Sequence, residues 1–165
     1  MSHGLPAPPP EPGAVRSLDF LAPKLRIRIV ALLDDMERRD QDASIAESLR
    51  SDERQSWLYG MGREYDDGRG VVTMAPTAVH SWHWYGLAVD ITSLHFGDNA
   101  PGVFWYHLGK VAKSYGLTWG GDWPRFTDRP HVQWGPPMRQ APSSRAVELK
   151  ASGGNAAVWK EVGAA

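Results

Sequence analysis

The 165-residue sequence contains no cysteine, which excludes disulfide bonds and cysteine-based zinc fingers but leaves the redox compartment open. No stretch approaches the roughly 18 consecutive apolar residues of a transmembrane helix, so we expect no stable insertion into a membrane. The N-terminal stretch MSHGLPAPPPEPG has no apolar core, so we expect no secretory signal peptide. The net charge is -1 and no run of lysine and arginine stands out, so nothing indicates a nucleic-acid partner.

What is present fits one globular domain with one core. Hydrophobic residues make up 42% of the chain and charged residues 22%, which is ordinary for a soluble protein of this length. Residues 1–17 are rich in proline and should form an extended, poorly ordered lead-in. We therefore divide the chain into this lead-in, a central domain at residues 18–135, and a tail at residues 136–165 that docks on the same domain.

Apolar spacing predicts helices and short strands in the central domain. Helices are predicted within residues 17–39, from Ser51 to near Gly62, and at residues 103–115. Strands are predicted within residues 42–51, where Ile45, Glu47 and Leu49 alternate with small residues, and at residues 71–73 and 87–91. A further strand and turn are expected in LTWGGDW, and a short helix in the tail at AAVWKEVG.

The stretch SWHWYGLAVDI, residues 81–91, places His83 and Asp90 seven residues apart. Seven residues rise about 10.5 Å in a helix and span about 23 Å in a strand, whereas two donor atoms on one metal lie about 3–4 Å apart. The chain must therefore bend if both side chains bind one ion, and Gly86 is the residue that tolerates a positive φ. The pattern predicts a loop, a turn at Gly86 and then a strand that carries Asp90. For this stretch alone, a hydrogen-bonded His–Asp pair without a metal is the alternative.

A second stretch, DRPHVQW at residues 128–134, favours a metal site. Asp128 is followed by His131, and Pro130 keeps the preceding backbone extended. Two histidines and one aspartate are three protein ligands, the number that a catalytic zinc site uses while its fourth position stays open for water. Asp128 would remain an unligated carboxylate near the metal, suited to take a proton from that water.

These two stretches resemble a known family. SWHWYGLAVD fits the pattern S-x-H-x-x-G-x-A-x-D, and D-x-P-H follows at residues 128–131. Both resemble the zinc D-alanyl-D-alanine carboxypeptidase and L-alanyl-D-glutamate endopeptidase family, whose distant fold relatives include lysostaphin-type peptidases and the hedgehog signalling domain. The phage endolysin branch is the most similar, since SLRSDERQSWLYGMGR and YGLTWGGDW also match it. The likeness runs from about residue 20 to residue 135.

The resemblance implies one zinc ion per chain, bound by His83, Asp90 and His131. It also implies that Asp128 is the general base, although the carboxypeptidase and dipeptidase branches commonly have Glu at that position. Arg50 matches an arginine that polarises the scissile carbonyl or holds the oxyanion, a role suited to its permanent charge.

The resemblance also implies roles for three further residues, and for two of them another role remains open. Gln55 and Ser81 match contacts to the polar groups of the peptide, and a helix-surface Gln and a turn-capping Ser are the alternatives. Asp122 in GGDW is expected to orient one of the metal ligands from behind. Val132 departs from the family pattern, since many relatives carry an aromatic residue directly after the last histidine. We expect this departure to change packing beside the zinc and not the ligand set.

The resemblance implies an α+β fold in which a small antiparallel sheet carries the zinc site and helices flank it, as in hedgehog and D-Ala-D-Ala peptidase-like domains. Residues 18–135 would then be the zinc peptidase catalytic domain. The implied activity is hydrolysis of the L-alanyl-D-glutamate bond of peptidoglycan stem peptides by metal-activated water. The implied biology is that of a monomeric phage endolysin, which is made in the host cytoplasm and reaches the wall with the help of a holin-type membrane-permeabilising protein.

Other functions remain open from the sequence. D-Ala-D-Ala carboxypeptidase or dipeptidase action would use the same site on a different bond. A non-catalytic cell-wall-binding module, or a protein-interaction domain, would keep a structural zinc. A wall-binding module would not need Asp128 or Arg50, so the presence of both residues argues against it. A protein-interaction domain would need an exposed apolar patch, which a sequence does not reveal.

Overall fold

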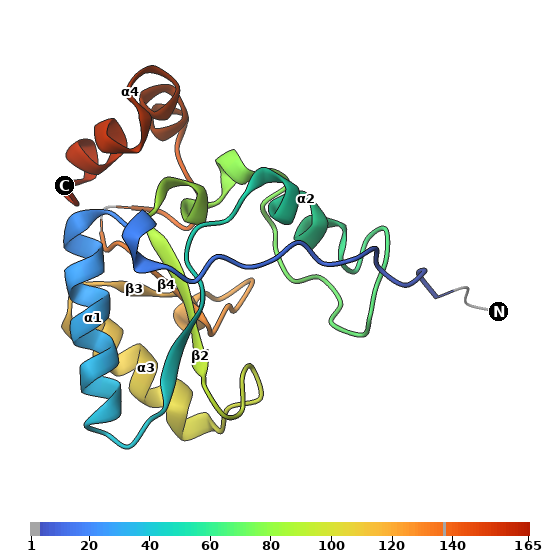
Figure 1. The fold of residues 1–165 in the computed structure, drawn as a ribbon, viewed down its shortest axis with the longest axis horizontal. Helices are drawn as coiled ribbons and strands as arrows, with labels where there is room; N and C mark the ends of the chain where they lie inside the picture. The colour runs from blue at the N-terminus through green and yellow to red at the C-terminus, as the bar shows by residue number, and fades with distance from the viewer. Residues whose placement is uncertain (1–3, 137) are drawn as a thin grey trace.

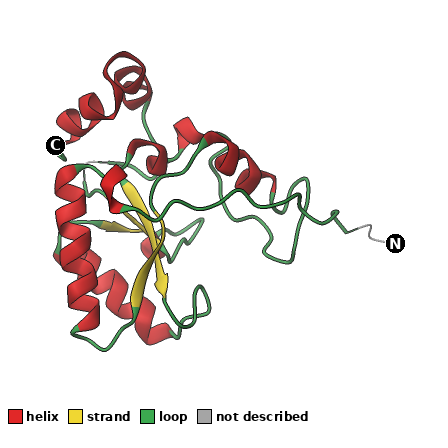
Figure 2. Cartoon of the chain, viewed as in Figure 1, coloured by secondary structure: helices red, strands yellow, loops and turns green. Residues whose placement is uncertain are grey.

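The computed structural model describes residues 4–136 and 138–165. It is an α+β domain in which a four-stranded antiparallel sheet is flanked by helices, which confirms the predicted fold class (Figures 1 and 2). In chain order the helices and strands are α1 (Pro23–Glu37), β1 (Ala43–Glu47), α2 (Asp52–Gly60), β2 (Ala88–Ser93), α3 (Gly102–Ser114), β3 (Thr118–Trp119), β4 (His131–Gln133) and α4 (Ser144–Val162). Short 3₁₀ turns lie before and between them: η1 (Leu18–Phe20) before α1, then η2 (Ala78–His80), η3 (Trp82–Tyr85) and η4 (Gly120–Asp122).

Helices α1 and α3 pack against each other and against the sheet, and together they enclose the main core (Figure 1). α1 begins with Pro23, a position where the missing N–H is not needed. Four side chains of α1 recur at the spacing of one helix face and are fully buried: Leu25, Ile29, Leu32 and Met36. α3 ends before Gly116, whose φ of +70° is the usual left-handed stop of a helix.

The sheet brings three polar side chains from three strands into one row. Its strand order is β1-β2-β4-β3, and Asp90 of β2 lies directly opposite His131 of β4. On the other side of β2, Glu47 of β1 lies opposite Asp90. The neighbours of Asp90 along the strand, Val89 and Ile91, point to the opposite face and are fully buried in the main core. The polar row therefore occupies the face of the sheet that α1 and α3 do not cover.

A β-bulge in β1 determines which residue completes this row. Ile45 lies opposite Ile91, which belongs to the main core, and Ile45 packs against that core. The register then shifts by one residue between Ile45 and Glu47, so that Glu47 and not Ala46 lies opposite Asp90. The sequence alternation placed Ile45 and Glu47 on the same face of the strand. The bulge is the reason that the structure places them on opposite faces.

Helix α2 lies to one side of the sheet and has a small core of its own (Figure 1). Its start is as predicted, because the Ser51 side chain accepts a hydrogen bond from the Arg54 backbone N–H. This second core consists of three buried side chains, those of Trp57, Leu58 and Met61. α2 is therefore anchored by far fewer apolar contacts than α1 and α3.

Residues 4–17 are extended, as expected, but they are held to the domain by hydrogen bonds. The indole N–H of Trp57 donates to the carbonyl oxygen of Pro9 at 2.9 Å. The backbone N–H of Ser48 donates to the carbonyl oxygen of Val15 at 2.6 Å. This N-terminal segment therefore runs along α2 and reaches the end of β1 (Figure 1).

The predicted strand at residues 71–73 is wrong, because these residues form an irregular loop. The carbonyl oxygen of Thr73 accepts a hydrogen bond from the Arg63 guanidinium at 3.0 Å, and the Thr73 hydroxyl contacts the Gln55 amide nitrogen at 3.4 Å. Side chains of and after α2 therefore take the polar groups that a strand partner would have taken.

The tail forms the long helix α4, which lies against the turn that precedes β2 (Figure 2). The indole N–H of Trp159 donates to the carbonyl oxygen of Tyr85 at 2.7 Å, and the indole N–H of Trp134 donates to that of Val162 at 2.8 Å. α4 has a kink at Gly154, where φ is +68°. Among the described residues, no helix combines the length and apolarity that crossing a membrane requires.

Gly86 makes the turn that was predicted between His83 and Asp90. It follows η3 with φ of +66° and ψ of +29°, in the left-handed region. A Cβ atom at this position would overlap the carbonyl oxygen of Phe20, and the Gly86 carbonyl accepts a hydrogen bond from the Ala22 N–H at 2.9 Å. The turn is therefore packed directly against the chain that enters α1.

We expect Gly86→Ala to lower the free energy of unfolding by roughly 2–5 kcal/mol, because it adds left-handed strain and a steric overlap. Gly97→Ala is the matched control, since Gly97 also has a positive φ, +56°, but a methyl group added there would meet only open space. The control should lose only about 1–2 kcal/mol. Urea denaturation measures both variants, and equal losses would show that the approach of Phe20 has no energetic consequence.

Candidate metal centre

His83, Asp90 and His131 meet on the polar face of the sheet. The Nε2 atom of His83 lies 3.3 Å from Oδ1 of Asp90, and Nδ1 of His131 lies 3.6 Å from the same oxygen. One donor atom from each residue lies within 4.8 Å of the other two. Ligands of a tetrahedral zinc ion, at bonds of about 2.0–2.2 Å, are about 3.4 Å apart. The three side chains therefore have the spacing of a shared metal site.

Two of these donor atoms are buried without a hydrogen-bond partner. Nε2 of His83 and Oδ1 of Asp90 are inaccessible to solvent, and no described residue forms a hydrogen bond with either. An unsatisfied buried polar atom is costly, so most such atoms in proteins have a partner. A divalent cation is the partner that would satisfy a histidine nitrogen and a carboxylate oxygen at one point. The residues present thus fit a metal ion.

The second nitrogen of each histidine is fixed by a hydrogen bond. Nδ1 of His83 lies 2.9 Å from the carbonyl oxygen of Ser48, which can only accept, so Nδ1 carries the proton. Nε2 of His131 lies 2.9 Å from Oε1 of Gln133, whose amide nitrogen donates to the carbonyl of Arg139. The other nitrogen of each ring faces Asp90 and is the one that a metal ion would bind in place of a proton.

Asp90 is ionised in this setting. Burial alone would raise its pKa, but His83, His131 and Arg50 together hold the pKa well below its usual range. Its second oxygen, Oδ2, accepts a hydrogen bond from Nη2 of Arg50 at 3.0 Å. Burial also disfavours the charge on Arg50, yet Asp90 and Glu47 keep the pKa of Arg50 above its ordinary value.

Asp128 lies beside the three ligands and outside their set. Its Oδ2 is 4.0 Å from Nδ1 of His131, and about a third of the side chain, 30%, is exposed. Burial and the nearby charge of Asp90 raise the pKa of Asp128. Gly120 supports this position, because the Asp128 N–H donates to its carbonyl at 3.0 Å and a Cβ on Gly120 would overlap the Asp128 backbone. A carboxylate with a raised pKa at this place is suited to exchange protons.

Arg50 holds the candidate ligand Asp90 in position, and it also lines the cavities beside the candidate ligands. Its Nε and Nη2 donate to Glu47, Nη2 also donates to Asp90, and Nη1 donates to the Gln55 side-chain oxygen. These bonds leave one N–H of Nη1 uncommitted among the described hydrogen bonds. The side chain is 9% exposed, so Arg50 reaches the site only at one edge.

Two residues expected at the substrate or behind a ligand are placed differently. Gln55 is fully buried, and its amide nitrogen donates to the Ala75 carbonyl while its oxygen accepts from Arg50, so it holds Arg50 and has no group left for a peptide. Asp122 accepts a hydrogen bond from Lys113 at 2.8 Å on the surface, and no described hydrogen bond joins it to His83 or His131. Gln55 and Asp122 differ from the expectation because other groups of the protein form hydrogen bonds with them. These groups are Arg50 and the Ala75 carbonyl for Gln55, and Lys113 for Asp122.

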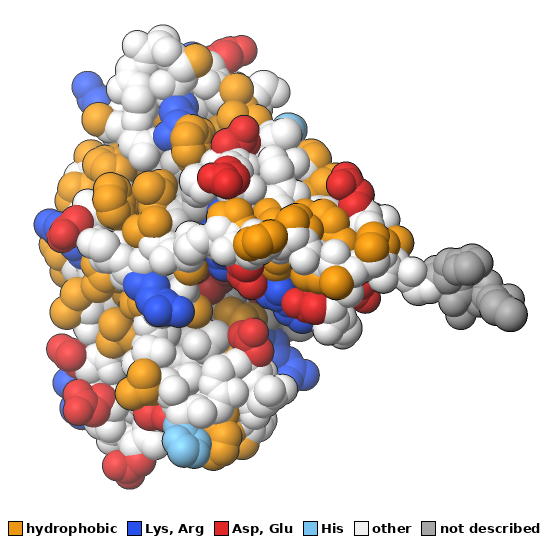
Figure 3. All heavy atoms as spheres, turned by 45° about the vertical axis from the view of Figure 1, so that its right-hand side comes forward, with side chains coloured by type: hydrophobic (Ala, Val, Ile, Leu, Met, Phe, Trp, Pro, Cys, Tyr) orange, Lys and Arg blue, Asp and Glu red, His pale blue; other side chains and the backbone are white. Residues whose placement is uncertain are grey.

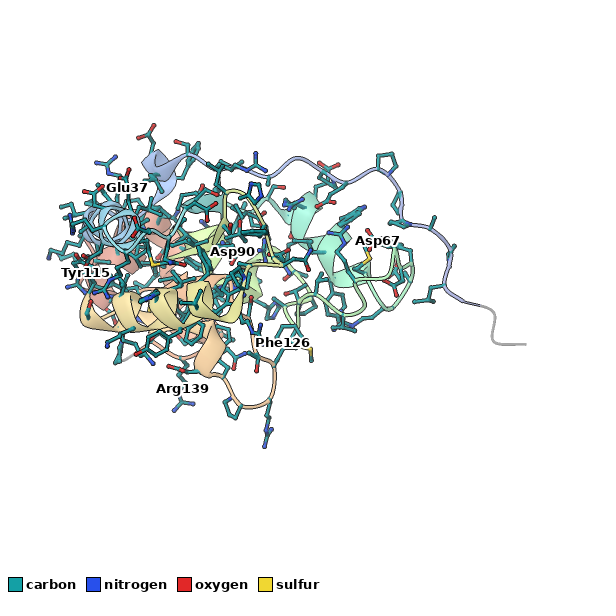
Figure 4. All side chains as sticks on the ribbon, turned by 90° about the horizontal axis from the view of Figure 1, so that it is seen from below. Glu37, Asp67, Asp90, Tyr115, Phe126 and Arg139 are labelled. Atoms are coloured by element: carbon teal, nitrogen blue, oxygen red, sulfur yellow. The ribbon has the colours of Figure 1, made fainter. Side chains whose placement is uncertain are left out.

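Two cavities open beside the ligands, and Ser81 lies in the wall of one of them. The ring-lined cavity has a volume of about 490 Å³ and includes the side chains Ser81, Trp82, His83, Trp123, Phe126 and His131. The charged cavity has a volume of about 420 Å³ and includes the side chains Arg54, Arg69, Asp90, Asp98, Phe126 and Arg129. Arg50, Thr73 and Asp128 line both cavities, as Phe126 does. Asp90 thus lies centrally, between the α1 and α3 side of the molecule and the loops that carry Asp67 and Phe126 (Figure 4).

Sequence reasoning missed three contributors: Glu47, Gln133 and the Ser48 carbonyl. Glu47 accepts hydrogen bonds from both Arg50 and Arg54, and only 5% of its side chain is exposed. The available signal was an acidic residue inside a strand pattern, a type that is rarely buried unless paired. Gln133 carried a similar signal, as a polar residue two positions from His131 on the same face of a strand. Nothing in the sequence pointed to the Ser48 carbonyl.

Comparison with known proteins agrees with this geometry. A family model described as D-alanyl-D-alanine carboxypeptidase matches residues 75–134, the stretch that contains the three candidate ligands and Asp128. The peptidoglycan L-alanyl-D-glutamate endopeptidase CwlK of Bacillus subtilis (strain 168) is 34% identical over 103 residues, which are 56% of this chain and 60% of that protein. The L-alanyl-D-glutamate peptidase of Listeria phage A118 is 28% identical over 125 residues, 73% of this chain and 40% of that protein.

The chain thus spans less than two thirds of either curated relative. Among solved structures, the L-Ala D-Glu endopeptidase ChiX of Serratia marcescens gives a TM-score of 0.43 with 22% identity, over 73% of this chain and 90% of that one. The family model and the curated relatives agree with the resemblance carried by residues 81–90 and 128–131. Residues 75–134 are therefore similar to the family described as D-alanyl-D-alanine carboxypeptidase, and the chain is similar to two curated proteins that are named for the L-alanyl-D-glutamate bond.

Proposed function

We propose that this protein is a zinc-dependent peptidoglycan hydrolase that cleaves the L-alanyl-D-glutamate bond of stem peptides. The observation that carries the proposal is the set of candidate ligands: two histidine nitrogens and one carboxylate oxygen converge, with Asp128 outside the set and two cavities beside it. A closed structural site would use a fourth protein ligand and would have no need of Asp128.

Zinc is the metal that this donor set favours. Imidazole nitrogens together with one carboxylate suit zinc, whereas magnesium and calcium prefer oxygen ligands throughout. Zinc at this site would polarise the scissile carbonyl and lower the pKa of a water molecule. The hydrogen bonds of His83 to Ser48 and of His131 to Gln133 keep both rings in the required orientation.

The chain supplies the proton transfer and part of the charge stabilisation. Asp128 takes a proton from the attacking water and delivers it to the nitrogen of the leaving D-glutamate. Arg50 turns its uncommitted Nη1 N–H toward the oxygen of the scissile carbonyl as negative charge develops there. Ser81, in the wall of the ring-lined cavity, contacts the peptide backbone of the substrate.

The choice of bond rests on the relatives. The curated relatives from Bacillus subtilis and Listeria phage A118 are both named for the L-alanyl-D-glutamate bond. The family model is described as a D-alanyl-D-alanine carboxypeptidase, so loss of terminal D-alanine is the second candidate activity. The phage relative favours an endolysin, which would act as a monomer and would depend on a holin-type protein to leave the host cytoplasm.

The product of the reaction tests the proposal. We expect the zinc-loaded protein to release, from purified peptidoglycan, fragments that begin with a new N-terminal glutamate and leave L-alanine on the muramic acid, as measured by mass spectrometry. Loss of terminal D-alanine alone would assign the carboxypeptidase activity instead. Absence of any cleavage with zinc bound would favour a wall-binding module.

Removing a ligand should remove the metal. We expect wild-type protein to retain about one zinc per chain after dialysis, as measured by inductively coupled plasma mass spectrometry, and His83→Ala to lose most of it because only two ligands remain. His95→Ala is the matched control, since His95 lies exposed in the loop after β2 and should leave zinc unchanged. Full zinc occupancy in His83→Ala would refute the ligand assignment.

Removing the base should leave the metal and stop turnover. We expect Asp128→Asn to keep its zinc and to lower kcat by about 10²–10⁴-fold, the usual contribution of a general base. Asp122→Asn is the control on the same loop, and its kcat should stay close to that of the wild type, because the Asp122 carboxylate binds Lys113 at the surface. Wild-type turnover in Asp128→Asn would exclude Asp128 from the mechanism.

A further inference from the structure

The charged cavity contains two side chains of opposite charge that are not paired. Asp98 comes from the loop between β2 and α3, and Arg129 comes from the loop before β4. Among the described residues, no ion pair or side-chain hydrogen bond engages either of them, although both line the same cavity of about 420 Å³. Figure 3 shows basic and acidic side chains gathered around a hollow beneath the extended N-terminal segment.

The other arginines of this cavity are already neutralised. Arg54 forms ion pairs with Glu47 and with Glu11 of the N-terminal segment. Arg69 binds Asp67 at 2.7 Å and Glu11 at 3.2 Å. Arg50 is held by Glu47 and Asp90. Apart from Asp128, the proposed base, Asp98 and Arg129 are therefore the charged side chains of this cavity that remain for a ligand.

The surroundings of Asp98 leave its charge uncompensated. Its partly enclosed position and the nearby charge of Asp90 raise the pKa of Asp98, and only Arg69 opposes them. A cation from a ligand would relieve both effects. Arg129, which lines the same cavity, would bind a carboxylate in the two-pronged manner of a guanidinium.

If the protein cleaves the L-alanyl-D-glutamate bond as proposed above, the charges of the substrate determine which side of that bond lies in which cavity. The alanine side of that bond carries a methyl group and, through an amide, the lactyl group of the sugar, and none of these is charged. The glutamate side carries a free α-carboxylate and continues into a diamino acid. The glutamate side therefore matches the charged cavity, and the alanine side matches the ring-lined cavity.

We propose that the charged cavity is a subsite for the third residue of the stem peptide, and that Asp98 and Arg129 select meso-diaminopimelate over lysine there. The free end of the diaminopimelate side chain bears an ammonium and a carboxylate on one carbon. Asp98 binds the ammonium and Arg129 binds the carboxylate. A lysine side chain ends in an ammonium alone, so it leaves Arg129 without a partner. This inference rests on the proposed function.

Three matched tripeptide substrates test it. Each is N-acetylmuramoyl-L-alanyl-γ-D-glutamyl-X, where X is meso-diaminopimelate, L-lysine, or 2-aminopimelate, which keeps the distal carboxylate and lacks the ammonium. We expect the wild type to show a kcat/KM about tenfold higher for diaminopimelate than for lysine, the effect of one added charge-assisted contact. The value for 2-aminopimelate should also lie well below that for diaminopimelate, because Asp98 then lacks its partner.

Two variants separate the two contacts. Arg129→Gln should reduce the diaminopimelate-to-lysine ratio of kcat/KM to near one. Asp98→Asn should abolish the advantage of diaminopimelate over 2-aminopimelate. Both side chains are exposed, so neither change threatens folding. Arg125→Gln is the matched control. Arg125 is an exposed arginine of the same loop as Arg129, but it lines the ring-lined cavity, so this variant should keep the wild-type ratios of kcat/KM.

The outcomes distinguish this inference from the function on which it rests. Equal kcat/KM values for the diaminopimelate and lysine peptides, with cleavage between alanine and glutamate, would overturn the subsite and leave the proposed function intact. If both Arg129→Gln and Asp98→Asn keep the wild-type ratios of kcat/KM between the substrates, the subsite is likewise overturned and the proposed function stays intact. No cleavage of any of the three peptides by zinc-loaded protein would overturn both.

Discussion

The buried negative charge of Asp90 is the constraint on which the rest of the site depends. One of its oxygens faces both histidines and the other binds Arg50. Arg50 in turn requires Glu47, Glu47 also binds Arg54, and Arg54 binds Glu11. Breaking a buried pair of this kind by removing one partner typically costs about 3–5 kcal/mol, because the other charge is left uncompensated. The series of alternating negative and positive side chains that leads from Asp90 to Glu11 is therefore as much a part of the site as the candidate ligands are.

The sheet makes this arrangement possible with little chain. Antiparallel pairing of β2 with β4 places Asp90 opposite His131, and the bulge in β1 places Glu47 on the other side of Asp90. Rigid strands hold two ligands and the residue that anchors Arg50, while loops supply Asp128 and the cavity walls. The sheet thus supplies two of the three candidate ligands, whereas His83 comes from the η3 turn and Asp128 from a loop.

Much of the fold and of the ligand set could be predicted because both depend on short-range patterns. His83, Gly86 and Asp90 belong to one stretch in which a metal site requires a turn, and a glycine is the residue that allows it. The support of the site depends on contacts between segments that are distant along the chain. Gln55 is an ordinary helix residue by sequence, and its role follows only from the approach of Arg50 and Ala75. Likewise, no local sequence pattern indicates the β-bulge, so the face of the sheet on which Glu47 lies could not be predicted.

The small core beneath α2 has a consequence for how the molecule responds to heat. The three candidate ligands belong to η3, β2 and β4, which are joined to the main core, whereas Gln55 lies on α2 and Arg50 lies two residues before it. A unit anchored by Trp57, Leu58 and Met61 opens at a lower free energy than one anchored by the main core. Fluctuations that detach α2 would therefore separate Arg50 from Asp90 while His83, Asp90 and His131 stay together. The contacts of Arg50 would then be lost at a lower temperature than the temperature at which the main core melts.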